Sequence, residues 1–509
     1  MSNWSEGYLV DVGYTYGYYS ELNPLRARLA LLKSGFAVPP VGAACELGFG
    51  QGLSVNMHAA AGEARWHATD FNPSQAAFAQ DLGAVTGASL FDQSFAEFCA
   101  RDDLPEFDFI GLHGIWSWIS DENRAVIVDF LRRKLKVGGL CYISYNTLPG
   151  WAAVGPLRHL MTQHADTMSA PGAGVVPRID AALDFADRLM ATNPAYARTA
   201  PVAAERLKSL RKSDRNYLAG EYFNDNWVPM YFSDVAAQLS GAKLSYACSA
   251  TYREHVEALN LSDDQQTILG EIADPVFRET VRDYMVNQQF RRDYWVRGPR
   301  TMTVTQQLQA LRAERIVLTS RREDVKLEAS GARGSASLNH DVYDPVLDVL
   351  ADNKPHSLGD IEQAVKAAGK TFNQVLQAAI VLIGKGDVSP AVSDEAAAAA
   401  RPRTDALNAE LLSMARSGRQ MSYLVSPLTG GGVVVGHIPQ LMLAARAEGY
   451  QSLETRIEAA YGNFTRNGRR ITRNGAVVSD PVEARAEFVA EATRGEELAF
   501  PILRNLGIA

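Results

Sequence analysis

The chain has 509 residues, of which 47% are hydrophobic and 21% charged, and its formal net charge at pH 7 is −8. This length exceeds what one compact core holds, so we expect roughly two to four domains. The mildly acidic balance provides no basic surface of the kind that binds nucleic acid or anionic membranes. The composition is that of an ordinary soluble globular protein.

The four cysteines, Cys45, Cys99, Cys141 and Cys248, are scattered and form no CxxC pair. This spacing predicts neither a zinc site nor a disulfide framework, and it favours a reducing compartment. The N-terminus lacks the basic and apolar regions of a signal peptide, and the longest apolar runs are too short to span a bilayer. We therefore expect a cytoplasmic protein with no membrane insertion and no metal.

Short apolar runs alternate with helical stretches from residue 41 to residue 145. Strands are predicted at residues 43–48, 65–71, 88–93, 107–114 and 140–146, and helices at 54–61, 74–83 and 124–135. Such alternation requires right-handed crossovers and indicates an α/β fold with a mostly parallel, Rossmann-like sheet.

The sequence becomes helical and alanine-rich after this sheet. Residues 151–216 are interpreted as a helical insertion, a lid or dimerisation element above the carboxyl edge of the sheet. A sixth strand is expected at Lys243–Ser249, and "RRDYWVRG" is expected to return as a seventh strand at the sheet edge. We divide the chain into a core with its N-terminal arm (1–150), the insertion (151–216), a segment that completes the sheet (217–320), a winged-helix-like domain (321–400) and a mostly helical domain (401–509).

The winged-helix-like assignment depends on the order helix, helix, helix, strand in residues 341–392, preceded by a polar linker or exposed strand pair at residues 320–339. The segment from Asp341 to Ala400 contains nine acidic residues and four lysines, which gives it a net charge of −5. DNA-binding winged helices need phosphate-facing Lys and Arg, so we expect this domain to pack against protein.

The turn "ELGFGQG", Glu46 to Gly52, follows the first predicted strand and precedes a helix. Glycines there permit a tight turn and close approach of the backbone to a ligand. The third glycine comes one residue earlier than in the dinucleotide fingerprint G-x-G-x-x-G, and no G-K-[ST] follows. The turn therefore argues against NAD and against a P-loop.

S-adenosylmethionine is the alternative nucleoside ligand. Because it carries no phosphates, its turn needs close contact with the backbone more than a site for an anion. Its ribose requires a carboxylate at the end of the second strand, where Asp70 stands in "HATDFNPSQ". A polar group at the end of the third strand would meet the adenine, and "LFDQSF" supplies Asp92.

Together, "ExGxGxG", an acid ending the second strand and "LKVGG" before the fifth resemble a class I S-adenosylmethionine-dependent methyltransferase over about residues 40–150. A more specific resemblance runs through "YTYGYYSELNPLRARLALL", "CELGFGQG", "TDFNPSQ", "LHGIWSWISDENR", "YISYNTLPGW" and "FRRDYWVRG". These segments look like the regulatory-domain-containing methyltransferases that include rickettsial-type protein lysine methyltransferases. The resemblance implies methylation of lysine side chains on surface or outer-membrane proteins, and a homodimer. The charge balance separately predicts no nucleic-acid partner.

Methyl transfer from a sulfonium is an in-line displacement, so the protein supplies position, orientation and a dry site. A lysine acceptor must arrive neutral, and aromatic faces would attract the cationic groups. The expected cofactor-binding residues are Glu46, Gly48, Gly50, Gly52, Asp70, Phe71, Asp92, Ser94 and His113. The expected catalytic residues are His113, Trp116, Tyr18 and Asn146, with Trp118, Tyr145, Trp151, Tyr14, Tyr16, Tyr19 and Asn23 as further aromatic or polar candidates.

Structural roles compete with several of these assignments. A tryptophan beside a strand is as often part of the core as of a ligand cage, and His113 is equally well explained by a bond to the backbone. The N-terminal tyrosines can simply pack an arm on the core. A small-molecule methyltransferase and a non-enzymatic S-adenosylmethionine sensor or scaffold remain alternatives to the lysine methyltransferase. An open groove distinguishes a protein acceptor from a metabolite, which needs a closed pocket.

Overall fold

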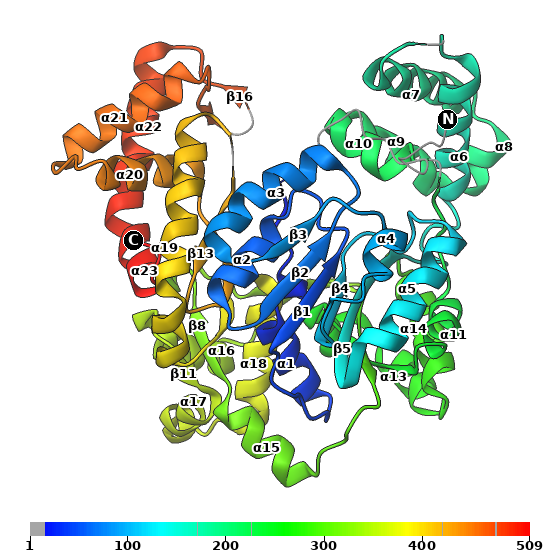
Figure 1. Ribbon diagram of the computed structural model, residues 1–509, viewed down its shortest axis with the longest axis horizontal. Helices are drawn as coiled ribbons and strands as arrows, with labels where there is room; N and C mark the ends of the chain where they lie inside the picture. Colours follow the sequence, from blue (N-terminus) through cyan, green and yellow to red (C-terminus); the bar gives the residue numbers. More distant parts are fainter. Residues whose placement is uncertain (1–15, 171, 225, 420, 474–475) are drawn as a thin grey trace.

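A computed structural model describes residues 16–170, 172–224, 226–419, 421–473 and 476–509. Its centre is a seven-stranded sheet in the order β3-β2-β1-β4-β5-β7-β6, in which only β7 runs antiparallel to its neighbours (Figure 1). The strands are β1 (Ala43–Leu47), β2 (Arg65–Thr69), β3 (Ser89–Phe91), β4 (Phe107–Leu112), β5 (Leu135–Asn146), β6 (Leu244–Ser249) and β7 (Phe290–Arg297). The α/β class and the Rossmann-like sheet are confirmed.

The expected position of the seventh strand at the sheet edge is wrong. β7 lies between β5 and β6, and its first residue, Phe290, pairs with Asn146 at the end of β5. Tyr294 and Trp295 on β7 point to opposite faces, and both are buried. A strand buried on both faces belongs inside a sheet, so the edge position falls to the more exposed β6.

Helices cover both faces of the sheet. One face carries α1 (Pro24–Lys33), α2 (Leu53–Ala61) and α3 (Pro73–Thr86), and the other carries α4 (Phe95–Cys99), α5 (Asp121–Lys134) and α11 (Phe232–Ser240). Alternate strand residues feed the two cores, as Phe109 and Ile110 of β4 do. This alternation follows from the two-residue period of a strand.

The helical insertion has a core of its own, in which Trp151, Leu183 and Tyr222 are buried (Figure 1, upper right). It consists of α6 (Gly155–Met168), α7 (Val175–Ala191), α8 (Ala195–Thr199), α9 (Pro201–Arg211) and α10 (Arg215–Tyr222). The helices thus run a few residues beyond the expected end at residue 216.

Three helices connect β6 to β7, namely α12 (Glu257–Asn260), α13 (Asp263–Gly270) and α14 (Pro275–Val286). After β7 the chain leaves the sheet through α15 (Val304–Ala313). Helix α14 begins at the capping residue Asp274, which accepts from the Phe277 amide, and it ends at Asn287 in the left-handed conformation. This geometry returns the chain directly into β7.

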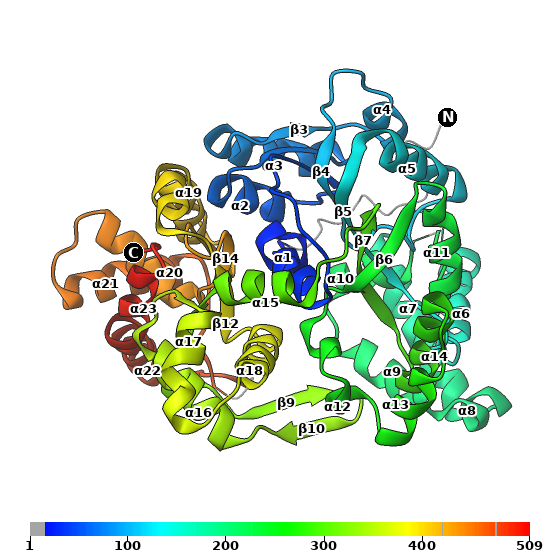
Figure 2. The same cartoon turned by 90° about the horizontal axis from the view of Figure 1, so that it is seen from below.

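The segment after α15 forms a small three-stranded sheet, β11-β8-β12, and three helices (Figure 2). Its elements are β8 (Arg315–Leu318), β9 (Glu328–Gly331), β10 (Gly334–Ser337), α16 (His340–Val349), β11 (His356–Ser357), α17 (Leu358–Val365), α18 (Phe372–Lys385) and β12 (Val388–Ala391). The expected order of three helices and a strand is present. β9 and β10 form the strand pair that was one of two interpretations of residues 320–339.

The C-terminal region is mostly helical, and it packs on the first half of the chain. It comprises α19 (Asp394–Arg416), β13 (Tyr423–Ser426), β14 (Gly431–Val434), α20 (His437–Ala447), α21 (Leu453–Arg466), β15 (Thr472–Arg473), β16 (Ala476–Val477), α22 (Pro481–Arg494) and α23 (Phe500–Asn505). α19 lies along α2 and α3, and the β13–β14 hairpin lies against α2 (Figure 1). None of the described helices combines the length and apolarity that crossing a membrane requires.

Candidate functional site

A cavity opens at the carboxyl ends of β1, β2, β3 and β4. Ligands of open α/β sheets bind at this edge. Seven of the expected site residues line the cavity, namely Glu46, Gly48, Gly50, Asp70, Phe71, Ser94 and His113. Tyr19 and Trp118, which were weighed as further candidates, line it as well.

The glycine turn after β1 is folded onto the end of β2. Gly48, Gly50 and Gly52 all have positive φ, between 57° and 76°, a conformation that side chains disfavour. The amide of Gly48 donates to the Thr69 carbonyl at 2.8 Å, and the amide of Gly50 donates to Asp70 Oδ2 at 2.8 Å. The turn and the acidic residue therefore form one hydrogen-bonded unit at the cavity wall.

Among the described residues, Asp70 and Glu46 are the two carboxyl groups that line the cavity, and both are almost completely buried. Burial raises the pKa of Asp70 to about 6, although the amides of Asn72 and Gly50 donate to it and act in the opposite direction. Burial and the neighbouring charge of Asp70 raise the pKa of Glu46 well above its usual range. Within the described residues Glu46 Oε2 has no hydrogen-bond partner, so a buried polar atom is available to a ligand.

His113 follows β4 at the opposite side of the cavity. Its Nδ1 lies 2.8 Å from the Tyr142 hydroxyl, and its ring stacks on the ring of Tyr19. Burial lowers the pKa of His113 to about 4, so the imidazole is neutral at pH 7. Phe290 of β7 meets the same ring edge-on, with centroids 6.4 Å apart.

Gly52 and Asp92 lie outside the cavity lining. A Cβ on Gly52 would collide with Ala79 of α3, so this glycine permits the turn to pack closely on the helix. Asp92 is exposed just after β3, and the next two residues, Gln93 and Ser94, line the cavity instead. Ser94 also caps α4, where its Oγ accepts from the Glu97 amide.

Three of the four expected catalytic residues are also away from the cavity lining. Trp116 is fully buried, and its Nε1 donates to Gln238. Asn146 accepts from Trp151 Nε1 through its side chain at 3.1 Å, at the base of the insertion. Tyr18 packs under the β13–β14 hairpin, and its hydroxyl lies 3.2 Å from His58 Nε2.

The other polar and aromatic candidates have mostly structural contacts. The Tyr145 hydroxyl donates to Asp293, Asn23 donates to the carbonyls of Thr429 and Gly430, and the Tyr16 ring meets Phe78. Tyr14 lies outside the described residues.

Sequence reasoning did not single out Asn123 and Asn226 at the wall beside Trp118. Asn123 lies in the first turn of α5, and Asn226 follows the insertion. The Trp118 ring lies near Trp227, and the Arg158 guanidinium sits 4.5 Å above Trp227 and 5.8 Å from Trp118. Asn123 lies in the segment "LHGIWSWISDENR", which contributes to the family resemblance, so that segment could have indicated it. Nothing in the local sequence indicates that Asn226 returns to the cavity.

Among the described residues, no three His, Cys, Asp or Glu side chains gather in a way that would hold a metal ion. The described lining of the cavity combines the glycine turn, two carboxyl groups and several aromatic rings.

Comparison with known proteins gives three results. Residues 214–297 match a family described as "Predicted methyltransferase regulatory domain". The chain is 38% identical to the uncharacterized protein sll1526 of Synechocystis sp., over 99% of this chain and 100% of that protein. It is 26% identical to the uncharacterized protein RP789 of Rickettsia prowazekii, over 37% of this chain and 34% of that protein.

Among solved structures, the fold is similar to that of PKMT2 from Rickettsia typhi in complex with AdoHcy. The TM-score is 0.68 at 18% sequence identity, and the alignment covers 97% of this chain and 100% of that one. The likeness therefore extends over the sheet, the insertion and the C-terminal region together.

Proposed function

The chain belongs to the class I S-adenosylmethionine-dependent methyltransferases that carry a methyltransferase regulatory domain, and on this basis we propose that it methylates lysine side chains of a protein substrate. The observation that carries this proposal is the likeness of fold to PKMT2 along the whole chain, with the insertion and C-terminal region included. An outer-membrane or other surface protein is the substrate class that the resemblance implies.

The cavity fits S-adenosylmethionine. We propose that Asp70 accepts hydrogen bonds from the ribose hydroxyls, while the turn at Gly48 and Gly50 allows close approach of the backbone. The buried Glu46 Oε2 would receive a polar group of the amino-acid moiety and thereby gain the partner that it lacks among the described residues. When bound, the cofactor supplies an electrophilic methyl group on a sulfonium.

The wall formed by Trp118, Ile119 and Asn123 is the side at which an amine acceptor would enter. Both carboxyl groups of the lining belong to the cofactor side, and the imidazole of His113 is neutral. Apolar walls disfavour an ammonium ion, so a lysine entering here would lose its proton to water. The Trp118 ring would attract the positive charge that develops on the amine nitrogen as it receives the methyl group, by a cation–π interaction.

In this proposal His113 orients the acceptor and does not act as a strong base. A group whose pKa is about 4 is a poor proton acceptor at pH 7. Its bond to Tyr142 and its stack on Tyr19 fix the ring plane, which is what a positioning role requires.

We further propose that the winged-helix-like segment binds protein and not nucleic acid. Its net charge of −5 between Asp341 and Ala400 repels phosphate groups. Within the chain this segment already packs against protein, because β12 contacts α1.

Transfer of radiolabelled methyl groups into a lysate of source cells that lack this protein tests the proposal. The products are separated into protein and small-molecule fractions, with an Asp70→Ala chain as the control. Label in a discrete protein, mapped to lysine by mass spectrometry and absent from the control, is the expected result. Label confined to small molecules would instead establish a metabolite methyltransferase, and cofactor binding without any label would favour a sensor.

A further inference from the structure

A second groove shares Phe290 with the surroundings of His113, since this ring lines the groove and also meets the His113 ring. It is lined by Glu254, Asn260, Arg282, Gln288, Phe290 and Ala332. All of these except Ala332 fall within residues 214–297, which match the methyltransferase regulatory domain. Ala332 comes from the turn between β9 and β10, and its amide donates to Asn260.

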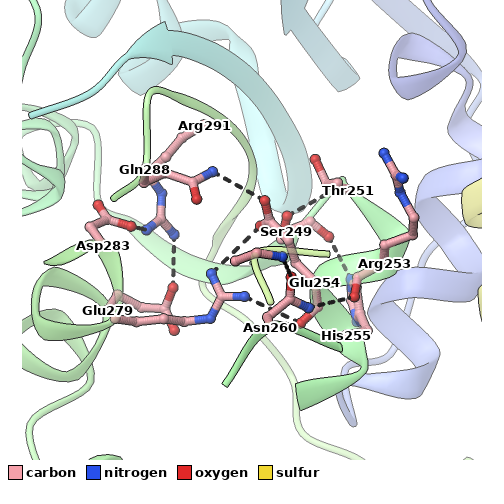
Figure 3. A network of polar contacts seen from close by, with 12 residues as sticks. Ser249, Thr251, Arg253, Glu254, His255, Asn260, Glu279, Asp283, Gln288 and Arg291 are labelled. Carbon is pink, nitrogen blue, oxygen red and sulfur yellow. Dashed lines mark hydrogen bonds and ion pairs between the residues drawn. The ribbon is translucent and has the colours of Figure 1, made fainter. Parts of the chain in front are cut away.

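Arg282 is the notable charge in this groove, because it is 91% buried and poorly paired. Among the described residues its guanidinium makes one hydrogen bond at 3.5 Å, to the Glu254 carbonyl, and one ion contact at 3.8 Å, to Glu254 Oε2. The nearby Arg291 differs, since it pairs with Glu279 and Asp283 at 2.6–2.8 Å (Figure 3) and also with Asp293 at 2.8 Å. A buried guanidinium with such long contacts retains donors for an anionic ligand.

Glu254 offers the complementary charge. Its Oε1 accepts from Gln288 Nε2 at 3.1 Å, while its Oε2 lies 3.8 Å from Arg282 Nη1. A cation and a carboxylate thus stand side by side in the groove without a close bond between them. Val286, Phe290 and Ala332 supply an apolar wall next to this pair.

We propose that the groove binds a free α-amino acid with an apolar side chain. Its carboxylate would bind Arg282, its ammonium group would bind Glu254, and its side chain would lie against Phe290 and Ala332. Ligand sites commonly combine an apolar wall with a few polar groups that fix orientation. A simple anion would use Arg282 alone and leave Glu254 as a repulsive neighbour.

The groove is connected to the cofactor cavity in two ways. Phe290 contacts the ligand groove and also meets the His113 ring edge-on. The Gln288 carbonyl accepts from the Gly150 amide, in the loop that follows β5, and a Cβ on Gly150 would collide with that carbonyl. An amino acid that fixes Phe290 would therefore fix His113 and Tyr19, and occupancy should strengthen S-adenosylmethionine binding.

Isothermal titration of the full chain tests the binding site, independently of any methyl acceptor. The probes are L-leucine and L-methionine, with acetate, isobutylamine and inorganic phosphate as single-charge controls. We expect saturable binding of the amino acids, about ten-fold or more weaker in Arg282→Gln and in Glu254→Gln, because each change removes one charged hydrogen bond. No binding by either amino acid, or phosphate or acetate binding as tightly as L-leucine, would overturn the proposal.

Two further variants distinguish a loss of binding from a loss of folding. Ala332→Trp fills the groove from the exposed hairpin without touching the ion pair, and it should abolish binding. Arg278→Gln alters an exposed arginine of the same helix and should leave binding unchanged. Equal binding by Ala332→Trp and Arg278→Gln would place the amino acid elsewhere.

The regulatory role, which depends on the proposed cofactor site, has its own test. Saturating L-leucine should lower the Kd of S-adenosylmethionine by about five-fold or more, a typical allosteric coupling. Phe290→Ala should weaken amino-acid binding, because an apolar contact is lost, and at saturating L-leucine it should also lose this coupling. An unchanged Kd in the wild-type chain would overturn regulation even where binding is found.

Discussion

The Tyr19 ring lies nearly flat on the imidazole of His113, with centroids 3.7 Å apart and the two planes inclined by 20°. One ring comes from the N-terminal segment and the other from the end of β4, and both line the cofactor cavity. The Tyr19 amide donates to Ser54 Oγ at 2.8 Å, so the segment is also tied to α2. The N-terminal arm is therefore a wall of the site.

The first prediction concerns Asp70. Asp70→Ala should weaken S-adenosylmethionine binding about ten- to a hundred-fold, because charge-assisted hydrogen bonds are lost. Binding to the wild type should also weaken below pH 6, where Asp70, with a pKa of about 6, takes up a proton. Calorimetry at pH 5 and pH 8 measures both effects. Asp92→Ala is the matched control, since Asp92 is exposed and outside the cavity, and equal losses in the two variants would contradict the assignment.

Gly52 should be more costly to replace than Gly87, although both have positive φ. Gly87→Ala adds a methyl group in open space, so it should cost about 1 kcal/mol of unfolding free energy. Gly52→Ala adds the same backbone cost and forces a collision with Ala79, for about 1–3 kcal/mol more. Chemical denaturation compares the two, and equal losses would show that the turn does not pack closely on α3.

Replacement by phenylalanine should mainly lower stability at Trp116 and mainly lower turnover at Trp118. Trp116→Phe leaves a cavity and an unpaired Gln238, so it should lower the unfolding free energy by about 1–3 kcal/mol. Trp118→Phe weakens a ring that lines the cavity and should lower turnover with a smaller loss of stability. Melting curves and methyl-transfer rates of both proteins separate the roles.

The hairpin between β13 and β14 should influence cofactor binding from a distance. A Cβ on Gly431 would collide with the Tyr18 hydroxyl, and a Cβ on Gly432 would lie 2.9 Å from the Tyr18 ring and from Met57 Sδ. Gly431→Ala should therefore displace Tyr18 and its neighbour Tyr19, and weaken S-adenosylmethionine binding several-fold. Gly436→Ala is the control, because its Cβ would make an ordinary contact at 3.6 Å. Identical affinities in the two variants would contradict the coupling.

Burial of a neutral His58 should lower the unfolding free energy of the chain in acid. Burial lowers its pKa to about 3, from 6.5, so between these values the unfolded chain binds a proton that the folded chain does not. As the pH falls from 6.5 toward 4, the wild type should lose about 1.4 kcal/mol per pH unit relative to His58→Leu. Denaturant titrations of both proteins at several pH values measure this difference. The difference is the proper readout, since Asp70 titrates with the opposite sign, and a constant difference would contradict the prediction.

The local sequence was sufficient to predict that the glycine turn and the end of β2 line the cavity. Gly48, Gly50 and Asp70 follow strands whose positions the apolar runs mark, and the conformation of a glycine turn depends on few neighbours. Asp92 shows where this reasoning ends. β3 stops at Phe91, and a shift of one residue at a strand end moves a side chain from one face to the other.

The positions of the N-terminal tyrosines and of β7 depend on contacts between distant segments, which local sequence does not reveal. Tyr18 and Tyr19 are adjacent, yet Tyr18 is held by Gly431 and Gly432 while Tyr19 reaches the cavity. Likewise β7 lies inside the sheet because α14 delivers Phe290 opposite Asn146, a pairing that no local pattern reveals. Side-chain direction at such positions is a property of the assembled chain.

The bonds from Asn23 to the carbonyls of Thr429 and Gly430 also impose an order on biosynthesis. At typical translation rates, about 20 to 80 s separate the emergence of these two segments from the ribosome. During that interval the sheet can form, but the arm that bears Tyr19 has no hairpin to hold it. The nascent protein therefore carries an unfinished cofactor site until nearly all of its residues have been made.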